Sequence, residues 1–471
     1  MDAFRSGAAA LCLALVAAAP ADPLDHAVTK FMSAAQIPGM QVLVIDNGRV
    51  TASRSYGVRD VESKAPVDAH TRFEIGSITK QFTAAAILQL KERGKLRLTD
   101  ALATYVPGYG AAKHVTIAQL LGQTSGIPNY TDTPAFKALK VTKDGTITIP
   151  QRGDVTRTVA LVKNKPLDFA PGTRWEYSNT NYALLGRIVE IASGMPWNAY
   201  VRANIFRPAG MDESAFMDDE GTMTDVATGY STLKGSLARA GTMNGWGAAA
   251  GAIVSTAGDL SKWDAALIGG KLLSADDLAT MLRPGTLPAL GQKSQYGYGW
   301  IVDAYDGQSR VWHNGQTLGF HASNQIYPGL SETIIVLANK RSDTDAVANA
   351  VFNALHPALA AAAAKPVAGE DPKITARVKR VWNSLQSGTL DRSELSDRVN
   401  AELTPAVVAQ SSKQLKALGA PTAWTYAGST ATGSTTTYKY RVEFATGDTF
   451  TVTMSVEAGG KITDFAIDPD N

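Results

Sequence analysis

The sequence predicts an α/β fold with a helical subdomain, followed by a small α+β domain. Strand-like runs lie near residues 40–57 and again at 309–340. Between them, residues 95–240 mix helical patterns with loops rich in Gly, Pro and Thr. One sheet is therefore expected to form from both ends of this region. Beyond residue 372, helical periodicity gives way to alternating apolar runs, which predicts the second unit.

The composition suits a globular protein with a large core. The chain has 471 residues, of which 45% are hydrophobic and 19% charged, and its formal net charge is +2. No basic run accompanies this balance, so nucleic acid and anionic membrane surfaces are poor candidates for partners.

Residues 1–21 are predicted to be a secretory signal peptide. Arg5 supplies a positive charge, the apolar core at 7–19 is too short to favour a membrane span, and Ala19-Pro20-Ala21 offers small residues for cleavage. A retained anchor is the alternative. The only cysteine, Cys12, lies in this segment, so the mature chain would have no disulfide and no thiolate. We expect a bacterial periplasmic or secreted protein with no stable membrane span after signal removal.

The next segments predict a helix, a β-hairpin and a second helix. Apolar side chains recur at helical spacing over residues 25–35. Asp46-Asn47-Gly48 lies between two β-rich runs and predicts a hairpin, because Asn-Gly tolerates the positive φ angles of a tight turn. The second helix is expected to begin near Ser77 and to end near Gly94.

A linker at 361–372 is predicted to separate a domain at 22–360 from a domain at 373–471. An Ala-rich helix end runs there into Pro, Gly and acidic residues. In the second domain, helices are expected first, and then a three- or four-stranded antiparallel sheet with turns at Thr446-Gly447-Asp448 and Gly459-Gly460. It shows no obvious reactive constellation.

The stretch FEIGSITKQF places Ser77 and Lys80 three residues apart. If a helix begins near Ser77, Lys80 lies one turn above it on the same face. A serine hydroxyl needs a base to react, and a buried lysine loses its proton more easily. The helix N-terminus also favours negative charge at the serine oxygen. Taken alone, such a pair is more often a serine N-cap beside an exposed lysine.

Tyr177 and Asn179 point to the same side if their stretch, WEYSNTNY, is extended. Tyrosine can act as a general base when a neighbouring ammonium lowers its pKa. An asparagine amide can hold a substrate carbonyl with its donor and the Lys80 ammonium with its acceptor. The alternative is that Tyr177 belongs to the core, and we expect Asn179 or Thr180 to cap the following helix in either case.

His313-Asn314-Gly315 lies at the end of a strand-like run. The glycine would let a substrate backbone lie against the strand edge, and His313 could donate a hydrogen bond into the site. The Gln316 amide could pair with that of Ser77 as an oxyanion hole. A lone histidine beside Trp312 is otherwise a core residue.

Ser-x-x-Lys, then Tyr-x-Asn, then His-x-Gly is a rare combination in one chain. It resembles the serine penicillin-recognising hydrolases, in the β-lactamase-related branch that contains class C β-lactamases, D-alanyl-D-alanine carboxypeptidases, D-aminopeptidases and related esterases. The stretches LLGQTSGIPNY, GAAAGAIVSTAGDLSKW and YGYGW add to this resemblance, which covers roughly residues 24–355. It implies a β-lactamase/transpeptidase-like antiparallel sheet flanked by helices, with an all-helical subdomain.

The resemblance also implies the chemistry, which is acyl transfer through an acyl-enzyme. Ser77 would be the acylated nucleophile, Lys80 its proton partner, and Tyr177 the general base that also protonates the leaving group. The residues implied to bind substrate are Asn179, His313 and Gly315, and the amides implied to form the oxyanion hole are those of Ser77 and Gln316. We expect a small-molecule, peptide or ester substrate, with no cofactor and no metal.

Two departures from the family pattern bear on the substrate. His313 stands where a permanent ammonium would suit a β-lactam or peptide carboxylate, and Gln123 stands where many relatives have His. A hydrolase of D-amino-acid peptide amides or of esters is therefore the first-ranked function, and a class C-type β-lactamase is the second. A penicillin-binding sensor that acylates without turnover is a further alternative.

Other readings have less support. His313 and His321 are eight apart and no His-Glu-x-x-His motif exists, which disfavours a metal hydrolase. Gly245, Gly247 and Gly251 are better explained as a packed turn than as a nucleotide loop. The C-terminal domain could bind a protein partner, whose identity the sequence does not indicate, or shield the cleft.

Overall fold

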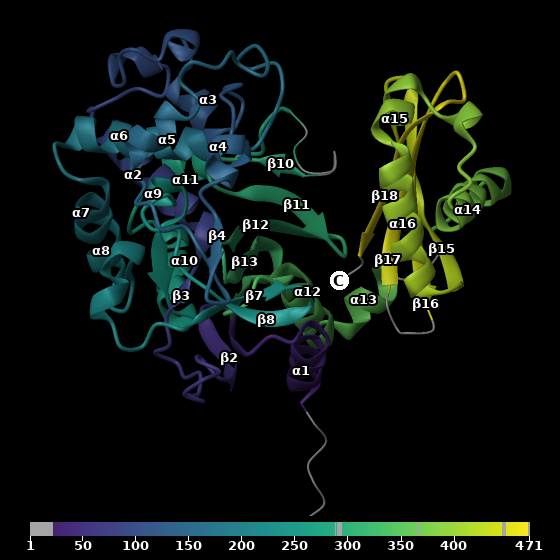
Figure 1. Cartoon of the computed structure of the whole chain (residues 1–471), viewed down its shortest axis with the longest axis horizontal. Coiled ribbons are helices and arrows are strands. Elements are labelled where there is room, and N and C mark those ends of the chain that lie inside the picture. Colours follow the sequence, from purple (N-terminus) through teal and green to yellow (C-terminus); the bar gives the residue numbers. More distant parts are fainter. Residues whose placement is uncertain are drawn as a thin grey trace, which may run out of the picture.

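The computed structural model describes residues 22–287, 289, 294–363, 365, 367–444 and 449–469. The predicted signal segment 1–21 and the predicted turn at Thr446-Gly447-Asp448 lie outside the described residues. A large sheet with helices on both faces comes first along the chain, and a smaller sheet with its own helices follows it (Figure 1). No helix within the described ranges has the length and apolar character that crossing a membrane requires.

The main sheet has seven strands in the order β10-β11-β12-β13-β14-β1-β2, and all neighbours are antiparallel. Its strands are β1 (Gly39–Asp46), β2 (Arg49–Gly57), β10 (Gln295–Tyr296), β11 (Ile301–Tyr305), β12 (Gln308–Gln316), β13 (His321–Tyr327) and β14 (Glu332–Ala338). In the register of β1 with β14, Met40 pairs with Ala338 and Asp46 with Glu332. The prediction that one sheet forms from both ends of the region is confirmed.

The predicted hairpin joins β1 to β2. Asn47 and Gly48 have φ angles of 48° and 74°. Positive φ at both central positions belongs to a two-residue type I′ turn, whose twist matches that of the flanking strands.

Both faces of the centre of the sheet are buried. Because side chains alternate along a strand, Leu43 and Ile335 enter one core, whereas Val42 and Val336 enter a second core on the opposite face. This explains why the sequence of β14 is a nearly continuous apolar run, without alternation of apolar and polar residues.

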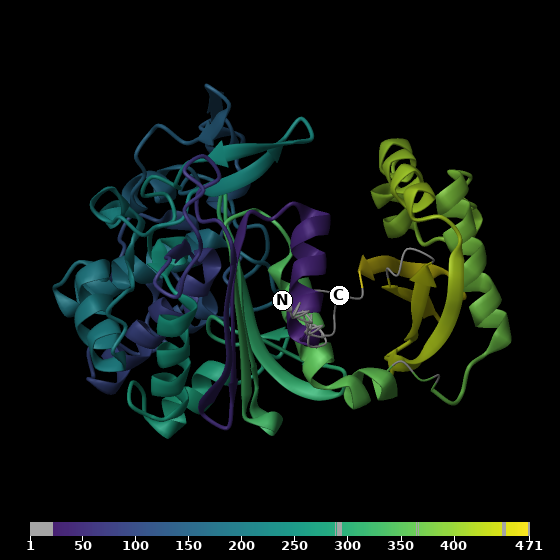
Figure 2. The same ribbon diagram turned by 90° about the horizontal axis from the view of Figure 1, so that it is seen from below.

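Helices cover these two faces. The second core contains side chains of α1 (Pro23–Ala35) and α12 (Thr344–Leu355), which pack on each other and on the sheet. Leu260 and Trp263 of α10 (Ala257–Ile268) join the larger core. Figure 2 shows α1 alongside the sheet on the side that faces the C-terminal domain.

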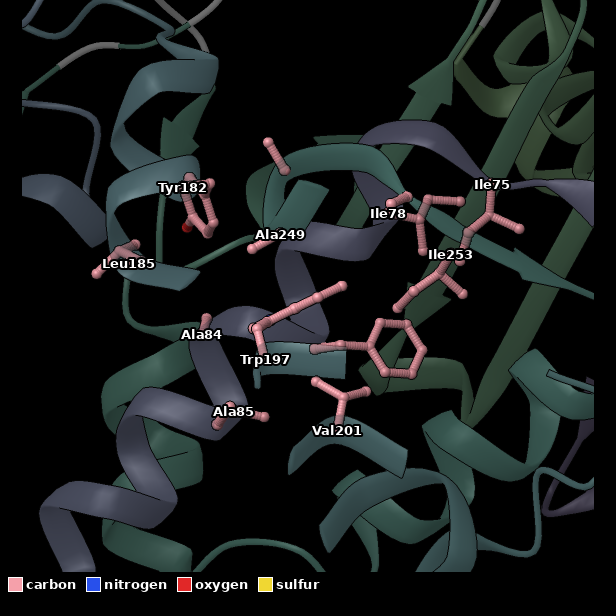
Figure 3. Packing of buried hydrophobic residues seen from close by; sticks show 14 of the residues in the cluster. Ile75, Ile78, Ala84, Ala85, Tyr182, Leu185, Trp197, Val201, Ala249 and Ile253 are labelled. Carbon is pink, nitrogen blue, oxygen red and sulfur yellow. The ribbon is translucent and has the colours of Figure 1, made fainter. Parts of the chain in front are cut away.

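The subdomain between the two ends of the sheet is mainly helical and surrounds α2 (Thr79–Glu92). This helix is buried on all sides from its start to Leu90. It packs against α6 (Asn179–Ser193) and α9 (Ala248–Gly251). Figure 3 shows small side chains, among them Ala84 and Ala249, at this contact. The other helices of the subdomain are α3 (Ile117–Leu121), α4 (Pro134–Lys137), α5 (Val155–Ala160), α7 (Trp197–Val201) and α8 (Arg207–Ala209), with α11 (Ala275–Leu282) after α10.

The expected all-helical subdomain also carries two small sheets. Their strand orders are β3-β9-β6 and β4-β5-β8-β7. The strands are β3 (Phe73–Glu74), β4 (Val141–Lys143), β5 (Thr146–Thr148), β6 (Ala215–Phe216), β7 (Gly229–Leu233), β8 (Ser236–Ala240) and β9 (Ile253–Ser255). Each has at most five residues, which is too short for a two-residue period to stand out in the sequence.

The C-terminal domain has helices first and a four-stranded antiparallel sheet after them, as predicted. The helices are α14 (Pro372–Ser387), α15 (Asp397–Glu402) and α16 (Pro405–Leu418), and the strands, paired in chain order, are β15 (Pro421–Thr432), β16 (Thr435–Phe444), β17 (Thr449–Glu457) and β18 (Ile462–Pro469). Trp382, Tyr440 and Met454 lie in its own core. The predicted linker begins within α13 (Pro357–Ala363), which leads to this domain (Figures 1 and 2).

Candidate active site

Ser77 lies in a single tight turn, Gly76–Ile78, that leads into α2. Gly76 has a φ angle of +49°, a conformation that favours glycine. The first N–H groups of a helix lack an acceptor within it, so the turn presents amide hydrogens beside the Ser77 hydroxyl. Ser77 itself is half-buried, which leaves it open to a substrate.

The Lys80 amine is completely buried and contacts three oxygen atoms. Its Nζ lies 2.9 Å from Ser77 Oγ, 2.8 Å from Asn179 Oδ1 and 2.8 Å from the Ala250 carbonyl oxygen. Burial lowers the pKa of Lys80 well below its usual value, and none of the salt bridges among the described residues involves its amine. A neutral amine has two N–H groups and one lone pair. In this neutral form the amine donates to the two carbonyl oxygens and offers its lone pair to the Ser77 hydroxyl, whereas the ammonium form donates to all three oxygens.

Tyr177 contacts the same serine. Its hydroxyl lies 2.8 Å from Ser77 Oγ, and its ring centroid lies 4.8 Å from Lys80 Nζ. The sequence-based expectation was a Tyr177 pKa lowered by an ammonium group. The direction is wrong, because burial raises the pKa of Tyr177. Tyr177 is thus a neutral hydroxyl at rest, and Lys80 is the stronger candidate for the base.

Asn179 joins the cluster from the first turn of α6. Its Oδ1 accepts from Lys80, while its backbone N–H and Nδ2 both donate to Asn129 Oδ1, at 3.1 and 3.3 Å. The prediction that Asn179 or Thr180 caps this helix is wrong. Ser178 occupies the cap position and makes no side-chain capping bond, and the Asn179 side chain contacts Lys80 and Asn129.

Gln123 accepts hydrogen bonds from the backbone on either side of Tyr177, a role that the motifs did not predict. Its carbonyl oxygen accepts from the Glu176 N–H at 3.0 Å, and its side-chain Oε1 accepts from the Ser178 N–H at 3.1 Å. Gln123 is fully buried and has a φ angle of 59°. The available signal was the unexplained Gln in LLGQTSG.

His313, on β12, packs against the Tyr177 ring, with ring centroids 6.1 Å apart, and is not among the residues that line the cavity at Ser77. Its Nδ1 lies 2.5 Å from the Asn314 carbonyl oxygen, which can only accept. Its Nε2 is therefore the acceptor for the Tyr296 hydroxyl at 3.0 Å. The expectation that His313 donates a hydrogen bond into the site is wrong in this structure, because both ring nitrogens already have hydrogen-bond partners. Burial, with the nearby Lys80, lowers the pKa of His313 to about 3, so the ring is neutral.

Gly315 is required by the nucleophile turn. A Cβ atom at this position would lie 1.8 Å from the Ile75 carbonyl oxygen and 2.8 Å from the Ser77 amide nitrogen. A Cβ on Gly76 would in turn lie 2.6 Å from the Gln316 amide nitrogen. Gly315 was expected to make room for a substrate backbone. In the structure it makes room for the close approach of β12 to the Ser77 turn.

A cavity of about 190 Å³ opens at the cluster, and Ser77, Asn179 and Gln316 line it. The residues thus fall into two groups. Ser77, Lys80, Tyr177 and Asn179 meet through hydrogen bonds, and Gln316 lies beside Ser77 at the cavity. His313 and Gly315 support the cluster from behind. No set of three or more His, Cys, Asp or Glu side chains in the described ranges is placed to hold a metal ion.

Comparison with known proteins adds a family match. The model of the family described as Beta-lactamase matches residues 24–358. Protein flp of Staphylococcus aureus (strain COL) is 29% identical over 334 residues, which cover 68% of this chain and 63% of flp. The chain thus spans less than two thirds of that relative's length.

Two solved structures share the fold. A D-stereospecific amidohydrolase from Streptomyces sp. is 27% identical with a TM-score of 0.60, covering 69% of this chain and 98% of its own. An octameric penicillin-binding protein homologue from Pyrococcus abyssi is 22% identical with a TM-score of 0.64, covering 95% of this chain and 98% of its own. The second is a likeness of fold alone, and its coverage reaches into the C-terminal domain.

Proposed function

This chain belongs to the beta-lactamase family, and from that premise we propose that it is an exported serine hydrolase acting through an acyl-enzyme on Ser77. Its proposed substrates are amides of D-amino-acid peptides, or esters. The observation that carries the proposal is the contact of Ser77 Oγ with both Lys80 Nζ and the Tyr177 hydroxyl, at 2.9 and 2.8 Å. A nucleophile, a base and a second proton-transfer group thus meet at one atom.

Acylation uses Lys80 as the base. Its lone pair takes the Ser77 proton while Oγ forms a bond to the substrate carbonyl carbon. The Ser77 and Gln316 amides are proposed to hold the resulting oxyanion. When the bond to the leaving group breaks, the Tyr177 hydroxyl gives that group its proton. The tyrosinate formed is stabilised by the new Lys80 ammonium beside its ring.

Deacylation runs through the same groups. A water molecule attacks the acyl carbon and gives its proton to the Tyr177 oxygen. Ser77 Oγ then leaves and takes back its proton from Lys80, which restores the resting state. Lys80 and Tyr177 therefore exchange the roles of base and acid between the two halves of the reaction.

The amide assignment is supported by the 27% identity to a D-stereospecific amidohydrolase. The neutral His313 side chain also supplies no fixed cation for a β-lactam carboxylate. Hydrolysis of a chromogenic cephalosporin with a higher kcat/KM than any amide or ester would reassign the chain as a β-lactamase. A burst of product with no steady turnover would indicate a sensor.

The test compares a panel of substrates on the wild type and on Ser77→Ala. The panel contains short-chain p-nitrophenyl esters, D- and L-amino-acid p-nitroanilides, a peptide ending in D-Ala-D-Ala and the cephalosporin. We expect turnover and an acyl adduct, seen by intact mass, on the wild type and on the control Ser261→Ala, whose serine lies away from the cluster on α10. An adduct that persists in Ser77→Ala would overturn the proposal.

A further inference from the structure

The cavity at Ser77 has two unneutralised cations in its wall. Lys140 and Arg341 both line it, together with Ser77 and Gln316. Both residues are exposed as a whole, and no salt bridge among the described residues includes either of them. The Lys140 ammonium instead lies 5.9 Å from the Phe136 ring centroid.

The two cations lie in the wall of the same cavity, so their charges oppose each other. Desolvation against the cavity wall lowers the pKa of Lys140, although the residue as a whole is exposed, and the Arg341 guanidinium and then Lys137 lower it further. Asp132 is the acidic group that opposes this shift, and its carboxylate is engaged by the Asn129 amide. Two like charges at one cavity, neither of them in a salt bridge among the described residues, leave a site that an anion would stabilise.

A third group points to the same ligand. Thr317 lines the cavity, and its buried Oγ1 has no hydrogen-bond partner in the described part of the chain. A buried hydroxyl without a partner is unfavourable. Because Oγ1 itself is closed to solvent, a rotation of the Thr317 side chain is needed to bring this hydroxyl to an acceptor in the cavity. Two cations and one hydroxyl donor are the chemistry that recognises a carboxylate.

The position of these groups shows which part of a substrate they would meet. Tyr177, the proposed donor to the leaving group, does not line this cavity, whereas the oxyanion amide of Gln316 does. The leaving group would then depart on the Tyr177 side, and the cavity would hold the acyl side.

We propose that Lys140, Arg341 and Thr317 form an anion subsite for the acyl part of the substrate, so that this hydrolase prefers acyl groups bearing a carboxylate. The inference rests on the proposed function of Ser77 and specifies the substrate class of that site. It also assigns carboxylate recognition to the acyl side of the cleft, away from His313.

The test uses two matched pairs of p-nitrophenyl esters with the same leaving group. Hydrogen succinate is compared with butyrate, and hydrogen adipate with hexanoate. Acylation of Ser77 is followed by nitrophenolate release and intact mass, after subtraction of spontaneous hydrolysis, so the result does not depend on turnover. We expect kcat/KM, or the acylation rate constant, to be about tenfold or more higher for at least one anionic member, as charge-assisted hydrogen bonds predict.

Variants assign that preference to the subsite. Lys140→Met, Arg341→Met and Thr317→Val are each expected to reduce the anionic-to-neutral ratio several-fold, and Arg341→Glu to invert it. Lys137→Met removes an exposed cation that acts on Lys140 but does not line the cavity, and it should change the ratio less than any of these variants.

The outcomes separate the inference from the proposed function. Equal rates within each pair in the wild type would overturn the anion subsite and leave Ser77 as the nucleophile. A preference that the variants at 140, 317 and 341 retain would also overturn it. Failure of every ester to acylate Ser77 would overturn the proposed function, and the subsite with it.

Discussion

Replacing Gly315 with alanine is expected to displace the nucleophile and to destabilise the domain. The new Cβ would lie 1.8 Å from the Ile75 carbonyl oxygen, whereas ordinary van der Waals contact begins at 3.4 Å. Strand β12 and the Ser77 turn would therefore have to separate by more than about 1 Å, a misplacement that can cost about 10²-fold in rate. Overpacking of this kind costs about 1–3 kcal/mol of folding free energy.

The assay measures the second-order rate of Ser77 labelling by a small fluorophosphonate, together with the thermal unfolding midpoint. Labelling is expected to fall about 100-fold and the midpoint by several degrees. Gly329→Ala is the control, since a Cβ there meets nothing within 4 Å and its φ is not in the left-handed region. If Gly315→Ala labels within threefold of wild type and unfolds at the same temperature, β12 does not support the turn. Gly315 would then serve the substrate.

Three further predictions follow from the site and its surroundings. Since burial lowers the pKa of Lys80 and the neutral amine is the base, Ser77 acylation should slow as the pH falls through that pKa. An acylation rate that does not fall at any pH at which the protein stays folded would contradict this, and Lys80→Arg, which stays protonated, should lose at least about 10²-fold. Gln123→Ala should lower kcat about tenfold with less effect on KM, because the Ser178 N–H loses its acceptor. Gln123→His, which can again accept, should recover part of that loss, and an alanine variant as active as wild type would refute this role of Gln123 beside Tyr177. Burial raises the pKa of Asp264 from 3.8 to about 8, so its protonated form stabilises the fold most below pH 4, and this contribution is lost as the pH rises to about 8. Urea unfolding at several pH values should show this slope in the wild type, and the same slope in Asp264→Asn would exclude Asp264 as its source.

Local geometry made part of the site predictable. Lys80 contacts Ser77 because side chains three apart meet on a helix, whatever the rest of the chain does. The hairpin at Asn47 and Gly48 followed from backbone preferences in the same way. The spacing and chemistry of Tyr177 and Asn179 made them candidates, but the family resemblance was needed to assign them to the Ser77 site, because nothing local brings residues about a hundred positions away to Ser77.

The remaining features depend on tertiary contacts. A glycine in a strand indicates close approach by a ligand or by another backbone, and only the fold shows that Gly315 meets Ile75. The direction of the Tyr177 pKa shift depends on burial and on whether Lys80 carries a charge, neither of which a motif reports. Gln123 was missed for a similar reason, since its bonds reach residues more than fifty positions away.

The pairing of β1 with β14 also has a consequence for how this domain is made. The Gly39 N–H bonds to Asn339 Oδ1, a partner 300 residues later in the chain. During synthesis, the edge of β1 that pairs with β14 therefore stays unpaired until β14 has been made. Contacts between residues so far apart in sequence slow folding. The ribosome can release helices of the subdomain early, yet the sheet that supports the Ser77 turn is completed only when the final strand arrives. The same closure brings the two ends of the catalytic domain together, so a circular permutant that joins them and opens an exposed loop should keep the native sheet.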